Sequence, residues 1–336
     1  MISKYLTADP VPWLLEESDP CVQYLTKRDI LGDNTPADYG ILCKSPELMK
    51  IMNSAQNGIL GDKTNFDIYY TGSMWLFAEA VARGLDRRIE SIERTAEFLA
   101  GRCQMPSGGF SLNWKPGTEV ACRTGDMIRS MILAGYRDER IKKGIDWIIS
   151  HQRHDGGWLH CPLAGIRDLF CLMLFNRAGK GLSREDDRGV TSCFYATIAC
   201  ANALAEYGRK NDSTAVKGAA GRAAEFFLKR ELYKNSEGYP LRPRWEWNRD
   251  FRLLGYPVMS QYDILYGLLF IARAGFSSDP RAGNAFNLVM SKQNTDGTWN
   301  LENAQTGMLY GNGRPPIGEK NKWVTLNALR LLKMAG

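Results

Sequence analysis

Hydrophobic residues recur along this chain at helical spacing, and the alternation typical of strands is nearly absent. Some segments are apolar almost all round, which is typical of helices buried on both sides. They are residues 70–82, 123–133, 191–205, 261–274 and 322–334. Other segments have one apolar stripe and a charged opposite face, at residues 88–100, 139–150 and 216–229. This alternation predicts an all-α toroid, an inner ring of helices wrapped by an outer ring, which helices at 20–31 and 46–55 close against the last helix.

A repeat supports this arrangement. The segments 95–110, 144–158 and 285–299 each have an apolar helical face, then a Gln, three further residues and Gly-x-aromatic. The glutamines, Gln104, Gln152 and Gln293, are 48 and 141 residues apart, which indicates a period of about 47 residues with degenerate copies between, such as 222–239. A period of this length holds two helices and their connectors. We therefore expect one toroid domain over residues 1–336.

The repeat ends at 104–110, 152–158 and 293–299 resemble the QW-type repeats of terpene cyclases and of protein prenyltransferase β subunits. Longer stretches look like the prenyltransferase/squalene-oxidase repeat proteins of bacteria and archaea, at residues 122–158, 191–206, 260–276, 291–303 and 322–333. The resemblance implies an (α/α)6-type toroid with a central cavity. It also implies an enzyme of cyclase or transferase type that acts on a hydrophobic or phosphorylated small molecule, such as an isoprenoid.

The signature motifs of that superfamily are not reproduced. The string nearest to the Asp-x-Asp-Asp of class II cyclases is Glu185-Asp186-Asp187, which lacks the first Asp at the required offset, and no Asp-Asp-x-x-Asp occurs. Protein prenyltransferases bind zinc through an Asp, a Cys and a later His. Here Cys122 precedes Asp126, so the order differs from theirs.

Cysteines near the starts of the inner helices suggest a metal site. Cys122, Cys161 and Cys193 would hold Zn²⁺, with His160 or Asp126 as the fourth ligand, because zinc takes thiolate, imidazole and carboxylate ligands. The alternative is that these thiols are small buried hydrophobes, since free cysteine is among the most buried residue types. Three further cysteines fall in apolar helical settings and are expected in the core: Cys103, Cys171 and Cys200.

The other two histidines are expected to be structural. His151 precedes the repeat Gln at the position of Lys292, and His154 matches Thr295 in the polar turn of the sister repeat. Positions that hold Lys and Thr in a related repeat are usually solvated.

Two aspartates are the acid/base candidates. Asp126 and Asp263 each fall in the first turn of an apolar inner helix, where two carboxyls facing one cavity would permit proton transfer, and Tyr262 stands beside Asp263. The alternative is that each carboxylate caps its own helix or pairs with an arginine.

Aromatic and basic residues at the same helix ends are the candidate substrate-binding set. They are Tyr70, Trp75, Arg123, Tyr195, Arg252 and Trp323. Aromatic faces suit an isoprenoid chain or a sugar by packing and a cation by the ring quadrupole. The run at 241–252 adds arginines that suit a phosphate or carboxylate, or that belong to a solvated connector.

Composition narrows the function classes. The 336 residues carry a net charge of +6 without a run of basic residues, which disfavours nucleic acid as a partner. No P-loop and no Gly-x-Gly-x-x-Gly after a strand occurs, so a nucleotide cofactor is not expected. The longest apolar stretch, 169–175, is too short to span a bilayer, and no leader peptide is recognised, so we expect a cytoplasmic protein.

Two other functions stay open at this point. Glycosidases and polysaccharide lyases with an (α/α)6 fold bind sugars on Trp and Tyr platforms beside paired carboxylates. A non-catalytic ligand-binding or scaffold toroid would explain the missing signature motifs.

Overall fold

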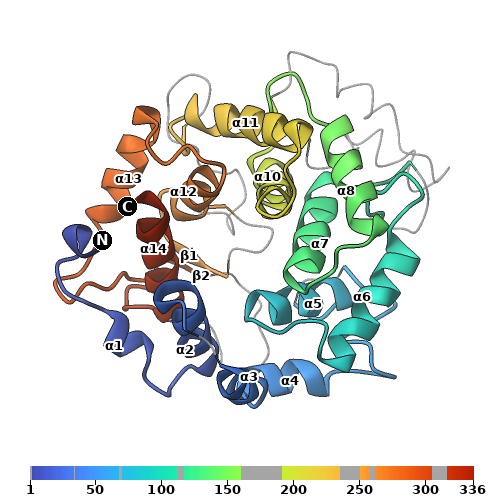
Figure 1. Cartoon of the computed structure of the whole chain (residues 1–336), viewed down its shortest axis with the longest axis horizontal. Coiled ribbons are helices and arrows are strands. Elements are labelled where there is room, and N and C mark those ends of the chain that lie inside the picture. The colour runs from blue at the N-terminus through green and yellow to red at the C-terminus, as the bar shows by residue number, and fades with distance from the viewer. Residues whose placement is uncertain are drawn as a thin grey trace.

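Helices alternate between an inner and an outer layer around a ring (Figure 1). The computed structural model describes residues 2–33, 35–67, 70–112, 117–159, 191–234, 250–257, 262–304 and 316–336. The inner layer comprises α2 (Pro20–Thr26), continued by the π-helical turn η2 (Lys27–Leu31), α5 (Ser73–Ala82), α7 (Ala121–Leu133), α10 (Phe194–Gly208), α12 (Ile264–Arg273) and α14 (Lys322–Ala335). The outer layer comprises α4 (Pro46–Asn53), α6 (Glu90–Cys103), α8 (Glu139–Ser150), α11 (Thr214–Leu228) and α13 (Gly283–Met290).

Short elements complete the described chain. They are η1 (Ile2–Tyr5), α1 (Val11–Leu14), α3 (Pro36–Cys43) and η4 (Pro280–Ala282), with a two-residue parallel pair, β1 (Gly255–Tyr256) and β2 (Asn303–Ala304). The predicted all-α toroid is confirmed. Its inner helices begin and end within three residues of the predicted bounds. The α2–η2 unit spans residues 20–31, as predicted.

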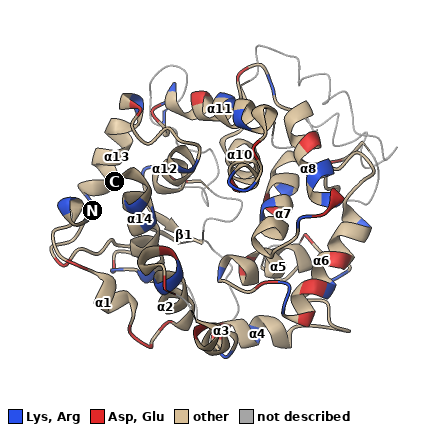
Figure 2. Ribbon diagram, in the orientation of Figure 1, with Lys and Arg blue, Asp and Glu red and all other residues tan. Residues whose placement is uncertain are grey.

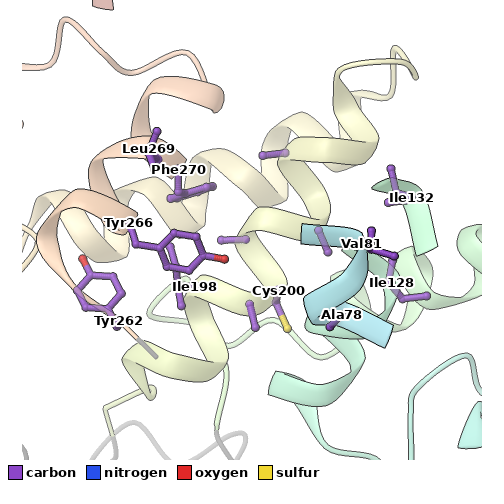
Figure 3. Close-up of a cluster of buried hydrophobic side chains, with 14 of the residues drawn as sticks. Ala78, Val81, Ile128, Ile132, Ile198, Cys200, Tyr262, Tyr266, Leu269 and Phe270 are labelled. Carbon is purple, nitrogen blue, oxygen red and sulfur yellow. The ribbon is translucent and has the colours of Figure 1, made fainter. Parts of the chain in front are cut away.

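The inner helices pack on one another and on the outer helix that follows each of them. α7 packs most extensively against α10, and α5, α12 and α14 continue the layer. Gly125 permits the close approach of α7 to α10, because a Cβ there would lie 2.4 Å from the carbonyl carbon of Ala199. Figure 3 shows the result, a single buried cluster to which α5, α7, α10 and α12 contribute side chains such as Val81, Ile128 and Phe270.

The glutamine of the repeat joins neighbouring outer helices. The side-chain amide of Gln152 donates to the carbonyl of Gly156 within its own turn and to that of Ala219 on α11, both at 2.9 Å. Gln104 likewise donates within its turn and, at 2.8 Å, to the carbonyl of Arg140 on α8. The turn needs glycine, because Gly156 has φ +89° and lies against the backbone of α11.

The aromatic residue of the repeat joins the outer layer to the next inner helix. Its backbone N–H donates to a fully buried threonine hydroxyl on that helix. The three bonds run from Phe110 to Thr124 (2.8 Å), from Trp158 to Thr197 (3.1 Å) and from Trp299 to Thr325 (3.0 Å). Each repeat turn is therefore held to both layers at once.

The amino-terminal segment closes the ring. Thr7 donates its hydroxyl to the carbonyl of Asn294 at 2.8 Å and its backbone N–H to the side chain of Gln293 at 3.1 Å. Further along, Arg330 of α14 donates to the Asp29 carboxylate of η2 at 2.9 Å. The predicted packing of the first helices against the last is thus confirmed, and Figure 1 shows the two termini close together beside α14.

One local prediction was wrong. The inner helix expected from residue 70 begins at Ser73, because Tyr70 has φ +67°, a left-handed conformation that an α-helix does not accommodate. Between the helices predicted at 20–31 and 46–55 lies a further helix, α3, which begins with a capping box formed by Thr35 and Asp38. Within the described ranges, no helix combines the length and apolar character needed to cross a membrane.

The bridging role of the repeat glutamine can be tested by substitution. We expect Gln152→Ala to lower the free energy of unfolding by about 1–3 kcal/mol, because it leaves two backbone carbonyls without their donor. Gln293→Ala is the matched control. The amide nitrogen of Gln293 is buried without a hydrogen-bond partner, and the side chain makes one bond, by accepting from the exposed Thr7 N–H, so its loss should cost less. Urea denaturation of both variants measures the difference, and equal losses would contradict the bridging role.

Candidate functional site

Charged side chains lie buried on the inner helices, among apolar ones. α7 carries Arg123 and Asp126 one helical turn apart, α10 carries Glu206, and Glu79 and Arg83 lie at the carboxyl end of α5. A buried charge is costly unless it is paired and hydrogen-bonded. The partners of these groups therefore define the polar sites of the inner layer.

The first polar site, the Arg123 site, consists of Asp67, Tyr70, Trp75, Arg123 and Asp126. Arg123 Nε lies 2.5 Å from an Asp67 carboxylate oxygen, and its guanidinium lies 5.1 Å from the centre of the Trp75 ring. The Trp75 indole donates to the Asp67 carbonyl at 3.1 Å, and the Tyr70 ring lies 5.3 Å from that of Trp75. Four residues of the predicted site, Tyr70, Trp75, Arg123 and Asp126, are thus brought together.

Asp126 is the second carboxylate of this site. Its Oδ2 atom lies 3.9 Å from Nη1 of Arg123, and its side chain is buried. Burial raises the pKa of the Tyr266 hydroxyl on α12. Of the charges near this hydroxyl, Arg129 lowers its pKa and the Asp126 carboxylate raises it. Figure 3 shows the Tyr266 and Tyr262 hydroxyls pointing in opposite directions. The Asp126 carboxylate of α7 therefore lies close enough to α12 to influence the pKa of Tyr266.

The second polar site surrounds Arg83. Its guanidinium donates to Glu79 at 2.7 Å, pairs with Glu47 of α4, and lies 5.0 Å from the centre of the Trp323 ring. Tyr256 stacks on Trp323 at 4.7 Å. Trp323, predicted to bind substrate, is therefore packed against two neighbours and largely buried.

Asp263 and Tyr262 hold the start of α12. The Asp263 carboxylate caps the helix by accepting from the backbone N–H of Tyr266, and it accepts from Gly255 on β1, both at 2.7 Å. Tyr262 donates to the carbonyl of Leu232 at 2.7 Å. Burial raises the pKa of Asp263 to about 6, despite the backbone donors that lower it. The capping alternative is therefore observed for Asp263, and a catalytic role for either residue stays a prediction.

The remaining binding candidates have local partners. Tyr195 is half-buried and its ring meets that of Phe251 edge-on at 5.8 Å. Arg252 donates from Nε to both carboxylate oxygens of Asp250, at 2.9 and 3.0 Å. Residues 241–249 of the basic run lie outside the described residues.

The metal candidates are described only in part. Cys122 is buried on α7, and Cys193 precedes α10, where its N–H donates to the carbonyl of Trp158 at 2.8 Å. His160 and Cys161 lie outside the described residues. Among the residues that the structure does describe, no three His, Cys, Asp or Glu side chains form a group suited to a metal ion. The zinc site stays a prediction.

The other cysteines and histidines have structural settings. Cys103 and Cys200 are fully buried, as predicted for core thiols, whereas Cys171 lies outside the described residues. His151 stacks on Trp147 with the ring centres 4.0 Å apart, and His154 is exposed.

Several polar residues of the inner layer were missed by the sequence analysis. They are Asp67, Glu79, Arg83, Glu206 and Arg273. For those on helices, the signal was polar positions spaced four or seven residues apart within otherwise apolar segments, such as Glu79 with Arg83 and Tyr266 with Arg273.

This chain is similar in sequence to a lanosterol synthase. A lanosterol synthase from Candida albicans is 28% identical over 192 residues, which is 48% of this chain and 26% of that protein. The match thus spans about a quarter of the relative's length. It confirms the predicted resemblance to terpenoid cyclases. No family model matches the chain.

Solved structures also match this chain, at lower sequence identity. A protein from Actinoplanes is 14% identical, with a TM-score of 0.44 and coverage of 95% of this chain and 90% of that one. The type II terpene cyclase MstE from Scytonema, in complex with geranylgeranyl dihydroxybenzoate, is 16% identical, with a TM-score of 0.33 and coverage of 86% and 95%. The toroid itself is seen directly in the structure of this chain (Figure 1).

The raised pKa of Asp263 makes stability depend on pH in a defined direction. The folded pKa of about 6 lies above the ordinary value of 3.8, so the folded state binds this proton first and gains stability as pH falls from about 6 to 4. We expect the stability advantage of the unmodified protein over Asp263→Asn to grow over this range. Denaturant titrations of both proteins at about pH 7 and pH 4.5 measure it.

Asp138→Asn is the control for this experiment. Asp138 caps α8, but hydrogen bonding to Arg140 lowers its pKa. Its contribution to stability is present above its ordinary pKa and is lost as pH falls, so the cost of this substitution should shrink in acid. Parallel behaviour of the two variants would contradict the assignment for Asp263.

Proposed function

We propose that this chain is a terpenoid-cyclase-like enzyme that binds an isoprenoid inside the toroid, with the Arg123 site as its catalytic centre. The observation that carries the proposal is the pairing of two carboxylates, Asp67 and Asp126, with a buried Arg123 beneath Trp75. The sequence likeness to a lanosterol synthase supports the reaction class.

Asp126 is the group that carries the proton. Arg123 contacts both carboxylates, that of Asp67 at 2.5 Å and that of Asp126 at 3.9 Å, and Asp126 is buried. In its protonated form the Asp126 carboxyl would give a proton to an alkene, whose π electrons form the new C–H bond, and the carboxylate would take a proton back when the cation is quenched.

The aromatic residues of the Arg123 site stabilise the positive charge that such a reaction creates. Trp75 and Tyr70 lie together beside Asp126's helix, and ring faces attract cations by about 0.5–2 kcal/mol each. Trp75 is fixed by its bond to the Asp67 carbonyl, so its face is preorganised. This differs from acid catalysis by an Asp-x-Asp-Asp motif, which the chain lacks.

Turnover of linear isoprenoids tests the proposal. We expect the purified protein to convert at least one of squalene, 2,3-oxidosqualene and geranylgeranyl diphosphate, as seen by mass spectrometry of extracted products. Asp126→Asn should lower kcat by at least about 100-fold, since it removes the proton donor. The control Asp146→Asn, on the exposed face of α8, should retain activity. The proposal fails if no substrate is converted or if both variants are equally active.

Zinc binding is a separate part of the proposal. Cys122, Cys161, Cys193 and His160 would hold one zinc ion per chain, of which Cys122 and Cys193 are described, at the starts of α7 and α10. Bound zinc would supply a Lewis acid in the same layer.

Elemental analysis of the purified protein tests it. We expect about one zinc per chain, lowered by Cys193→Ser and unchanged by Cys43→Ser, a half-buried thiol outside the proposed set. Less than about 0.2 zinc per chain in the unmodified protein would refute the proposed zinc site, because an occupied site binds one ion per chain.

A further inference from the structure

A pocket lies between the two layers of the ring, beside both ends of the chain. It has a volume of about 330 Å³, and its walls come from η1, α12, α13 and α14, with the 277–280 connector at its edge. Figure 1 shows α13 outside α12 and α14, with the two termini next to them. No residue of the Arg123 site lines this pocket. It is therefore a second candidate site, which we call the interlayer pocket.

The walls of the interlayer pocket are apolar. Leu268 and Ile271 of α12 and Leu331 of α14 form the side that belongs to the inner layer. On the opposite side, Phe286 of α13 meets the ring of Tyr5 edge-on, with the ring centres 5.6 Å apart. Small-molecule sites have volumes from about 300 Å³ upwards and walls that are mostly aliphatic and aromatic. The interlayer pocket has both properties.

Gly283, the first residue of α13, helps to keep this pocket open. Its backbone angles are those of an ordinary helix, φ −58° and ψ −44°, and a Cβ placed on it would meet no neighbouring group within 4 Å. Neither the backbone conformation nor a close neighbour therefore requires glycine, which is less favourable than alanine in a helix by up to about 1 kcal/mol. Because Gly283 is half-buried and lines the pocket, its missing side chain contributes to the volume.

The polar edge of the pocket offers hydroxyls more readily than charge. Among the described residues that line it, only Asp279 is charged, and its carboxylate accepts from the backbone N–H and the guanidinium of Arg281, at 2.9 and 2.7 Å. Ser277 and Ser278 are exposed at the same edge. Among the outer helices that the structure describes, only α13 has no charged residue (Figure 2). A neutral ligand with a hydroxyl therefore suits this pocket better than an ion, because burial of an unpaired ion is costly.

The volume of the pocket limits the size of the ligand. A cavity of about 150 Å³ binds benzene, and the interlayer pocket is roughly twice as large. It has room for roughly ten to thirteen non-hydrogen atoms on this scale. A triterpene such as squalene is too large for it, so the pocket is distinct in ligand size as well as in position from the site of the proposed reaction.

We propose that the interlayer pocket binds a neutral apolar molecule of this size that carries one hydroxyl. Its apolar part would pack between Leu268 and Phe286, and its hydroxyl would bond to Ser277 or Ser278 at the edge. Such a ligand contacts η1, α13 and α14 at once, so it fastens the amino-terminal segment to the last inner helix. The site does not depend on the proposed function.

Calorimetric titration with three neutral alcohols tests the pocket. 1-Decanol, 1-adamantanol and 2-naphthol each have about eleven non-hydrogen atoms and one hydroxyl, and they differ in shape. We expect at least one of them to bind with a Kd of about 100 μM or lower. Hydrogen exchange locates the bound alcohol, because it should slow the exchange of backbone amides in residues 2–8 and 277–286.

Substitutions that fill the pocket give the critical comparison. Gly283→Leu and Ala272→Leu should each weaken binding by at least about tenfold, because the new side chain occupies the space of the ligand. Gly101→Leu is the matched control, since Gly101 is an exposed glycine of α6 whose added Cβ would likewise meet no neighbour. Asp126→Asn, at the Arg123 site, should bind the alcohol as the unmodified protein does, which separates this pocket from the interior of the ring.

The proposed site is refuted if none of the three alcohols binds, or if binding leaves the exchange of residues 2–8 and 277–286 unchanged. Normal binding by a filled variant that is folded by circular dichroism also refutes it. If one filled variant fails to fold, the other decides. A dimer that Gly283→Leu converts to a monomer would refute it as well, because the pocket would then be a contact between two copies of the chain.

Discussion

The hydrogen bond from a repeat-turn N–H to a buried threonine hydroxyl holds the two layers of this toroid in register. Thr124, Thr197 and Thr325 accept this bond at equivalent points of three inner helices, each fully buried. A buried donor left unpaired costs about 1–3 kcal/mol, so each bond strongly favours one position for the start of the helix. Asp126 lies two residues beyond Thr124, and its place in the inner layer follows from that bond.

The same architecture determines how charged residues are accommodated on the inner helices. Inner helices that touch neighbours on every side have little contact with water, so each charge there needs a protein partner. Arg83 meets this need completely, with Glu79, Glu47 and an aromatic face. Arg123 meets it with Asp67 and Trp75. Glu206 meets it with Arg129, Arg273 and the more exposed Arg209.

Polar groups of the inner layer are thus divided along the helix axis. The amino-terminal part holds Asp126 with Arg123 and the rings of Trp75 and Tyr70. The carboxyl-terminal part holds Arg129 and Arg273, which approach the same Glu206 carboxylate.

Periodicity alone predicted the ring, since helices that are apolar all round must be covered on both sides, and the Gln, Gly and aromatic positions of the repeat marked the turns. It also brought Tyr70, Trp75, Arg123 and Asp126 to one end of the inner layer. It left open whether Asp263 caps α12, and it did not reveal that Tyr70 stops a helix or that Arg273 shares Glu206 with Arg129. The Glu206 contacts join residues more than 60 positions apart on different helices, so only packing in three dimensions decided which buried charges meet.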